Sequence, residues 1–155
     1  MTITYKDIRE RKLDIEKERN ARISPIYSAA SALVDEYKES LELGSDTWAD
    51  IRGISHPYVV IGIVNEEGEF QKKPLTEIKL TPECRLNFTI STVTDDSPEG
   101  GDTVLVGVTL FFDSNHVVNA KVGNQTIYIR DDRTDVCNVI KGDVMRMIDN
   151  PELRR

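Results

Sequence analysis

Few residues in this chain of 155 are of a type and spacing that could perform acid–base or metal chemistry. There are two histidines: His56 precedes a proline in a loop, and His116 begins a strand after a turn. Neither has further donors at the spacing of a zinc site. Asp113 lies three residues before His116 and could orient it, but tight turns select Asp for their own geometry. We therefore expect no metal site, no cofactor and no catalytic residue.

Three other patterns fall short of a catalytic motif. Glu77 with Lys79 matches part of the strand motif of metal-dependent nucleases, but no acidic partner lies on a neighbouring strand end. The glycine-rich segment 99–102 is acidic and precedes a strand, whereas a phosphate-binding loop leads into a helix. Cys84 and Cys137 lie 53 positions apart and outside any CxxC pair. We expect them to be buried free thiols, with Cys137 in a structural role.

Aromatic and imidazole side chains cluster at the entrance to the first long strand. Trp48, His56 and Tyr58 are close together in the sequence. They could line a small-molecule pocket between a helix over 24–43 and the sheet, or they could close the end of the core. The first interpretation describes a small-ligand-binding domain or an enzyme, and it is the alternative to the function expected below.

Charge is unevenly distributed along the chain. The net charge is −7, but residues 1–23 carry seven Lys or Arg and five Asp or Glu, so residues 24–155 carry −9. Because an acidic body repels phosphate backbones, we expect no nucleic-acid partner. The longest apolar runs, 58–64 and 104–112, are far shorter than the roughly 18 residues of a membrane span. The first residues lack the apolar core of a signal peptide, so we expect a cytoplasmic protein without a membrane partner.

The segment 103–130 organises the predicted fold. It contains three apolar or alternating runs separated by turn residues, which is typical of consecutive β-strands. Connections of two to four residues force antiparallel pairing. Two further strands precede this segment. The predicted strands cover 58–64, 84–94, 104–112, 116–122 and 125–130.

Helices are predicted on both sides of the strands. The pattern over 5–22 indicates a mostly polar helix, and the pattern over 24–43 indicates a strongly amphipathic one. Because Ser24-Pro25 suits either a helix start or a kink, one bent helix and two separate helices stay open as alternatives. Residues 46–52 are predicted to add a helical turn. A last helix is predicted over 133–149.

Together these elements predict an α+β fold, with N-terminal helices and a C-terminal helix packed on an antiparallel sheet of five or six strands. We expect a single domain over 1–155, in which 1–23 is a polar helical extension. A chain of this length can bury a sizeable core without disulfides or metals.

The function expected from these patterns is protein binding rather than catalysis. The run 104–112 is apolar on both faces, so one helical layer would leave a face uncovered, and the helix over 5–22 is too polar for a core. We expect a small, acidic, non-catalytic interaction module, such as an inhibitor- or immunity-like adaptor, that self-associates as a homodimer. The residues expected at its interface are Ile8, Ile15, Val106, Val108 and Leu110.

Overall fold

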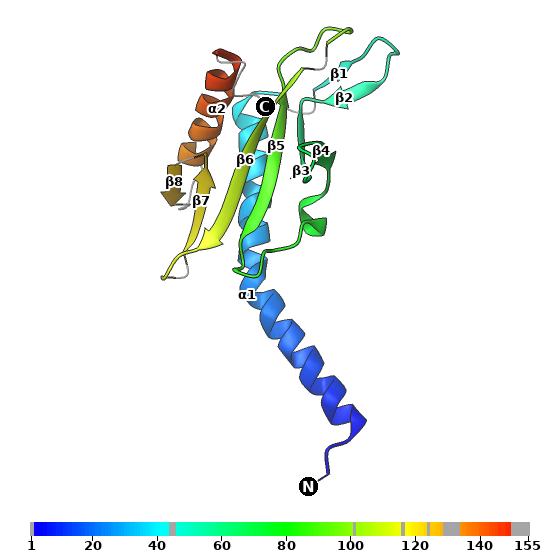
Figure 1. The fold of residues 1–155 in the computed structure, drawn as a ribbon, viewed down its shortest axis with the longest axis vertical. Helices are drawn as coiled ribbons and strands as arrows, with labels where there is room; N and C mark the ends of the chain where they lie inside the picture. Colours follow the sequence, from blue (N-terminus) through cyan, green and yellow to red (C-terminus); the bar gives the residue numbers. More distant parts are fainter. Residues whose placement is uncertain are drawn as a thin grey trace.

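The computed structural model describes residues 2–43, 46–100, 102–115, 117–123, 125–128 and 134–149. The chain begins with one long helix, α1 (Tyr5–Ser40), that contains Pro25 in its interior. The two alternatives for this region are therefore decided in favour of a continuous helix. Figure 1 shows its N-terminal half projecting away from the body and its C-terminal half lying against the sheet. Figure 1 also shows α1 changing direction between these two halves, and a proline inside a helix favours such a bend because it removes one backbone hydrogen bond from the helical ladder.

A capping box starts α1. The Thr4 hydroxyl accepts a hydrogen bond from the Asp7 backbone N–H at 3.3 Å, and the Asp7 carboxylate accepts one from the Thr4 backbone N–H at 3.0 Å. These bonds satisfy two backbone donors that a helix start otherwise leaves open. They also lower the pKa of Asp7, because the backbone and hydroxyl groups of Thr4 stabilise its ionised form.

Six strands form one antiparallel sheet in the order β4-β3-β5-β6-β7-β8. This arrangement confirms the α+β fold with its antiparallel sheet. Every strand pairs antiparallel to its neighbours. The strands are β3 (Val59–Val64), β4 (Phe70–Lys72), β5 (Leu86–Val93), β6 (Thr103–Phe112), β7 (Val118–Val122) and β8 (Gln125–Tyr128).

The register of β5 and β6 separates an apolar face from a more polar one. On the apolar face Leu86 pairs with Leu110, and the other buried pairs there are Phe88 with Val108 and Ile90 with Val106. On the opposite face the pairs are Asn87 with Thr109, Thr89 with Gly107 and Ser91 with Leu105. In Figure 1 α1 lies behind the sheet, so this second face, which we call the open face, is turned toward the viewer.

Two helices cover the apolar face. The Tyr37 hydroxyl of α1 lies 2.8 Å from the hydroxyl of Thr92, which shares the apolar face of β5. The second helix, α2 (Thr134–Asp149), packs beside α1, where the Cys137 thiol approaches the Leu33 carbonyl oxygen at 4.0 Å. Burial of Tyr37 between α1 and the sheet raises its pKa, because removal from water destabilises the charged phenolate.

The core contains three of the side chains that were expected at an interface. Val106 and Val108 are 1% exposed and Leu110 is 0% exposed, because their positions on β6 face α1 and α2. These three side chains are closed off from a partner by the chain's own helices. Any contact with a second copy must therefore use other residues.

Residues 46–57 differ from the prediction of a helical turn and a loop. They form a separate two-stranded hairpin, β1 (Thr47–Ala49) paired with β2 (Ser55–Pro57). The cause is local, since the Asp50 carboxylate accepts hydrogen bonds from two backbone N–H groups of the turn, and Gly53 adopts a φ of +79°. A short 3-10 helix, η1 (Leu75–Glu77), follows β4.

Candidate functional site

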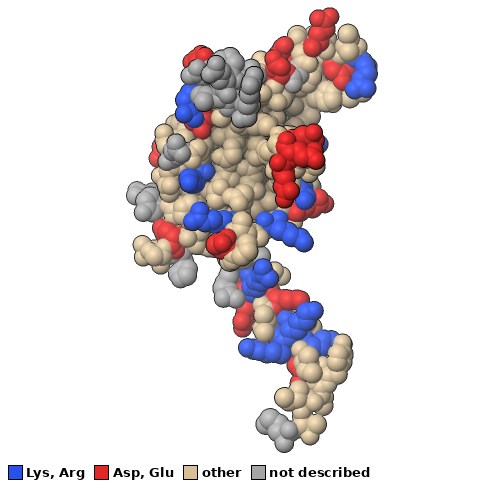
Figure 2. Space-filling view, in the orientation of Figure 1, with Lys and Arg blue, Asp and Glu red and all other residues tan. Residues whose placement is uncertain are grey.

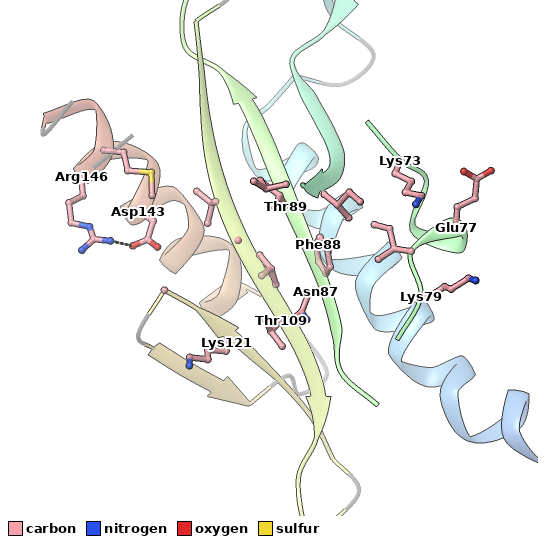
Figure 3. Close-up of a pocket in the computed structure, with 18 residues that line it drawn as sticks. Lys73, Glu77, Lys79, Asn87, Phe88, Thr89, Thr109, Lys121, Asp143 and Arg146 are labelled. Atoms are coloured by element: carbon pink, nitrogen blue, oxygen red, sulfur yellow. Dashed lines mark hydrogen bonds and ion pairs between the residues drawn. The ribbon is translucent and has the colours of Figure 1, made fainter. Parts of the chain in front are cut away.

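A hollow with a volume of about 750 Å³ crosses β5 and β6. It lies between the C-terminal half of α2 on one side and the segment around η1 on the other (Figure 3). This volume is in the range of small-molecule sites. The lining residues are Ile63, Val64, Lys73, Glu77, Ile78, Lys79, Asn87, Phe88, Thr89, Val106, Gly107, Val108, Thr109, Lys121, Gly123, Asp143, Arg146 and Met147.

Part of the polar lining comes from the open face of the sheet. Asn87, Thr109 and Lys121 are cross-strand neighbours on β5, β6 and β7, and they form a row across three strands. The Thr109 hydroxyl donates a hydrogen bond to the Asn87 Oδ1 at 2.6 Å. In the next row Gly107 carries no side chain, and a Cβ placed there would meet no atom within 4 Å. The hollow is therefore open above Gly107 and bordered by polar groups.

Four cationic side chains surround this hollow. Figure 3 shows Arg146 and Lys121 on the side of α2 and β7, and Lys73 and Lys79 on the side of η1. Arg146 forms an ion pair with Asp143 at 3.2 Å. None of the three lysines forms an ion pair with any residue that the structure describes. The lining thus has a local excess of positive charge in a chain whose net charge is −7.

Trp48 and His56 lie together on the β1–β2 hairpin, where they are cross-strand partners. Their rings are 5.0 Å apart at an interplanar angle of 31°. His56 Nε2 lies 2.8 Å from Asp50 Oδ2, and the bond to His56, supported by the turn N–H groups, lowers the pKa of Asp50 to about 2. The Trp48 indole Nε1 is buried and has no hydrogen-bond partner among the described residues.

Tyr58 follows β2 directly and bonds to a loop outside the hairpin. Its hydroxyl donates a hydrogen bond to the Asp96 carboxylate at 2.7 Å, and this interaction raises the pKa of Tyr58. Tyr58 lines a hollow of about 160 Å³ beside the end of α1. Another hollow, of about 520 Å³, lies between α1 and the β3–β4 edge. Trp48 and His56 line none of these three hollows.

The remaining candidates divide between surface and core. Cys137 is buried, as expected. Cys84 is exposed, contrary to expectation, because it lies in a turn with a φ of +60°. Glu77 belongs to a 3-10 helix and not to a strand, which removes the structural basis of the nuclease motif. His116 lies outside the described residues.

Sequence reasoning missed the hollow and most of its polar lining. The alternation of side chains along β5, β6 and β7 could have placed Asn87, Thr109 and Lys121 on one face of the sheet. Side chains two positions apart on a strand lie on the same face. Arg146 and Lys73 come from α2 and from the segment after β4. No local pattern indicates that these two elements flank the same part of the sheet.

The chain was compared with family models, curated proteins and solved structures. No family model, no curated protein and no solved structure matches it.

In the described part of the chain, no three His, Cys, Asp or Glu side chains come together as a metal site requires. Among these same residues, no helix combines the length and the apolar character needed to cross a bilayer.

Acidification is expected to disorder the β1–β2 hairpin only below the ordinary titration range of aspartate. The pKa of Asp50 lies near 2 in the folded protein, below its ordinary value of 3.8. Its carboxylate therefore stabilises the hairpin above pH 3.8, and this effect is lost as the pH falls through about 2. Because Trp48 is the only tryptophan, its emission maximum should shift to longer wavelength across this interval.

The variant Asp50→Ala should show the shifted emission already at neutral pH, since the carboxylate that holds His56 and the turn is gone. Asp95→Ala is the matched control, because it removes another loop carboxylate with a lowered pKa. It should leave Trp48 emission unchanged. Wild-type emission in Asp50→Ala at neutral pH would show that the carboxylate does not order the hairpin.

Proposed function

We propose that this protein is a non-catalytic interaction module that pairs with a second copy of itself through the N-terminal part of α1. We call residues 2–21 the arm; every residue in this range is exposed. Figure 2 shows the arm extending from the body with a mixed surface of basic, acidic and uncharged side chains. A segment of this kind contributes nothing to the core of its own domain.

Apolar side chains are concentrated on the arm. Among the described residues, five of the eleven exposed large hydrophobic side chains lie there. Ile8 is 59% exposed and Ile15 is 45% exposed. The other three are Ile3, Tyr5 and Leu13. Clustered exposed apolar side chains indicate a contact surface, whereas scattered ones are normal.

The observation that carries the proposal is the position of Ile8 and Ile15 on the helix. They lie 18 positions before Ile26 and Leu33, which are both 0% exposed in the core. Eighteen residues are five turns of an α-helix, so all four side chains lie on one face of α1. At this spacing the apolar positions that pack on the sheet repeat into the arm, where no described residue covers them.

Interactions within the arm stabilise its helical conformation only weakly. Two ion pairs at i,i+4 spacing, Lys6–Glu10 and Lys12–Glu16, each have an N–O distance of 3.9 Å. Such pairs contribute a few tenths of a kcal/mol, and most helical stability in proteins comes from packing of an apolar face. Ile8 and Ile15 are one heptad apart, which places them on one seam of a two-helix contact. A two-fold contact between two arms buries both.

Substitution of this seam should break self-association while leaving the fold intact. In Ile8→Lys/Ile15→Lys the symmetric dimer should lose the burial of four isoleucine side chains, about 4 kcal/mol, which corresponds to about a thousandfold weaker dissociation constant. Sedimentation velocity over a concentration series measures this constant. The control Ile51→Lys changes an equally apolar side chain, 73% exposed, in the turn of the hairpin, and should have no effect.

Two outcomes would contradict the proposal. A wild-type mass that stays at 17.5 kDa up to high concentration would exclude self-association. A dissociation constant that rises steeply with salt would indicate that the basic excess of the arm docks on the acidic body. Contact between two arms, each with a small positive charge, should not weaken when salt is added.

A further inference from the structure

The row Asn87–Thr109–Lys121 on the open face has donors that no group in the described chain uses. Thr109 donates to Asn87 Oδ1, so the amide oxygen is occupied and the amide N–H₂ group is left as a donor. The Lys121 ammonium forms no ion pair or hydrogen bond with the residues that the structure describes. Both groups therefore offer donors, and one of them carries a positive charge.

The surroundings favour an anion with an apolar body. Beyond the polar row, the hollow continues over Gly107 and is bordered by apolar side chains that include Val64 and Met147. Thr89, which is 8% exposed, adds a hydroxyl at the cross-strand position beside Gly107. On the other side Lys73 and Lys79 outnumber the one carboxylate there, Glu77, so the net charge of that side is positive (Figure 3). Charge-assisted hydrogen bonds to such donors are stronger than neutral ones.

We propose that this hollow binds a small organic anion, a carboxylate or a phosphate monoester, with its anionic group at Lys121 and Asn87 and its apolar body over Gly107. This ligand site is separate from the arm, and the proposal goes beyond self-association. A polyanion such as nucleic acid is disfavoured because residues 24–155 carry −9. A ligand of small-molecule size suits a hollow of about 750 Å³.

The test uses 8-anilinonaphthalene-1-sulfonate, a fluorescent anion with an apolar body, and the uncharged N-phenyl-1-naphthylamine, which lacks the sulfonate. The full chain should bind the anion at least about fivefold more tightly than the neutral compound, as expected for one partly exposed charge-assisted contact. Equal affinity for the two compounds would overturn the proposal, because the hollow would then recognise only apolar surface.

Charge reversal at the polar row provides the sharpest comparison. Asn87→Asp keeps the size of the side chain and its acceptor for Thr109, but it places a negative charge beside the anion. Binding should fall at least about tenfold. Asn65→Asp is the matched control, since it adds the same charge to an asparagine whose Oδ1 accepts from the backbone N–H groups of Glu67 and Glu69. Equal effects of the two substitutions would overturn the site.

Two further variants test the position of the ligand. Lys121→Gln should weaken binding about fivefold, whereas Lys6→Gln in the arm removes the same charge without effect. Gly107→Leu should block the hollow, because a Cβ there meets open space, and thermal unfolding verifies that the variant stays folded. Wild-type binding by a folded Gly107→Leu, or by Lys121→Gln, would contradict the proposal.

Competition identifies the class of anion. Benzoate and phenyl phosphate each displace the fluorescent anion from the wild-type chain if the site recognises the negative charge, and the stronger competitor identifies the preferred group. Failure of both to displace it at millimolar concentration would overturn the proposal. The same titration in Ile8→Lys/Ile15→Lys should give wild-type affinity for the fluorescent anion. Failure of the self-association proposal can therefore be distinguished from failure of the ligand-site proposal.

Discussion

Replacement of Gly62 by alanine is expected to destabilise the protein by about 3 kcal/mol, although glycine to alanine is a small change. A Cβ on Gly62 would overlap the carbonyl oxygen of Gln71 and the ring of Phe70, both on the neighbouring edge strand β4. The backbone oxygen cannot rotate away as a flexible side chain could, so β3 and β4 must separate. Urea unfolding monitored by circular dichroism measures the loss of free energy.

Gly107 is the matched control for this substitution. It also lies inside a strand, but its Cβ would meet no atom within 4 Å. Gly107→Ala should change the free energy of unfolding by no more than about 0.5 kcal/mol, or stabilise the strand slightly, because glycine is entropically unfavourable there. Similar losses in the two variants would show that close approach of β4 is not the cause.

Leu110→Ala is expected to lower the free energy of unfolding by about 2–5 kcal/mol. Leu110 is 0% exposed and lies on the apolar face of β6, so the substitution leaves a cavity under the helices as well as removing buried apolar surface. Equilibrium unfolding in urea and the thermal midpoint both report this loss. The same experiment distinguishes core from interface, because an interface residue would affect association and leave the isolated fold stable.

Leu105→Ala is the comparison for the opposite face. Leu105 lies five positions earlier on the same strand and is half-buried on the open face. Its truncation should cost about 1 kcal/mol, since less surface is removed from contact and no closed cavity forms. A larger loss from Leu105→Ala than from Leu110→Ala would reverse the assignment of the two faces.

Much of this fold follows from local sequence patterns. The apolar run 104–112, the alternation in 84–94 and the helical spacing in 133–149 predicted β6, β5 and α2 to within a few residues. Hydrophobic periodicity and turn residues act over short distances, so one sequence contains the information. Antiparallel pairing followed from the same source, because short connections allow no other arrangement.

Local signals were ambiguous where a single side chain could serve two geometries. Pro25 suits a helix start and also a position inside a bent helix, and the structure places it inside α1. Asp50 suits a helical turn as well as a hairpin turn, and its hydrogen bonds to the Arg52 and Ile54 backbone N–H groups select the hairpin. At Pro25 the packing of the second half of α1 on the sheet decided between conformations of similar local free energy, whereas at Asp50 the local hydrogen bonds decided.

The sequence alone determined the fold class, the strands and helices with strong periodicity, the acidic body and the polar character of the arm. Tertiary structure decided which apolar side chains are core, because the burial of Val106, Val108 and Leu110 depends on where α1 and α2 pack. It also decided the hollow, whose cations come from β7, α2 and the region of η1. Residues so far apart in the chain come close in space only when the sheet has formed. No local sequence pattern indicates that they will be neighbours.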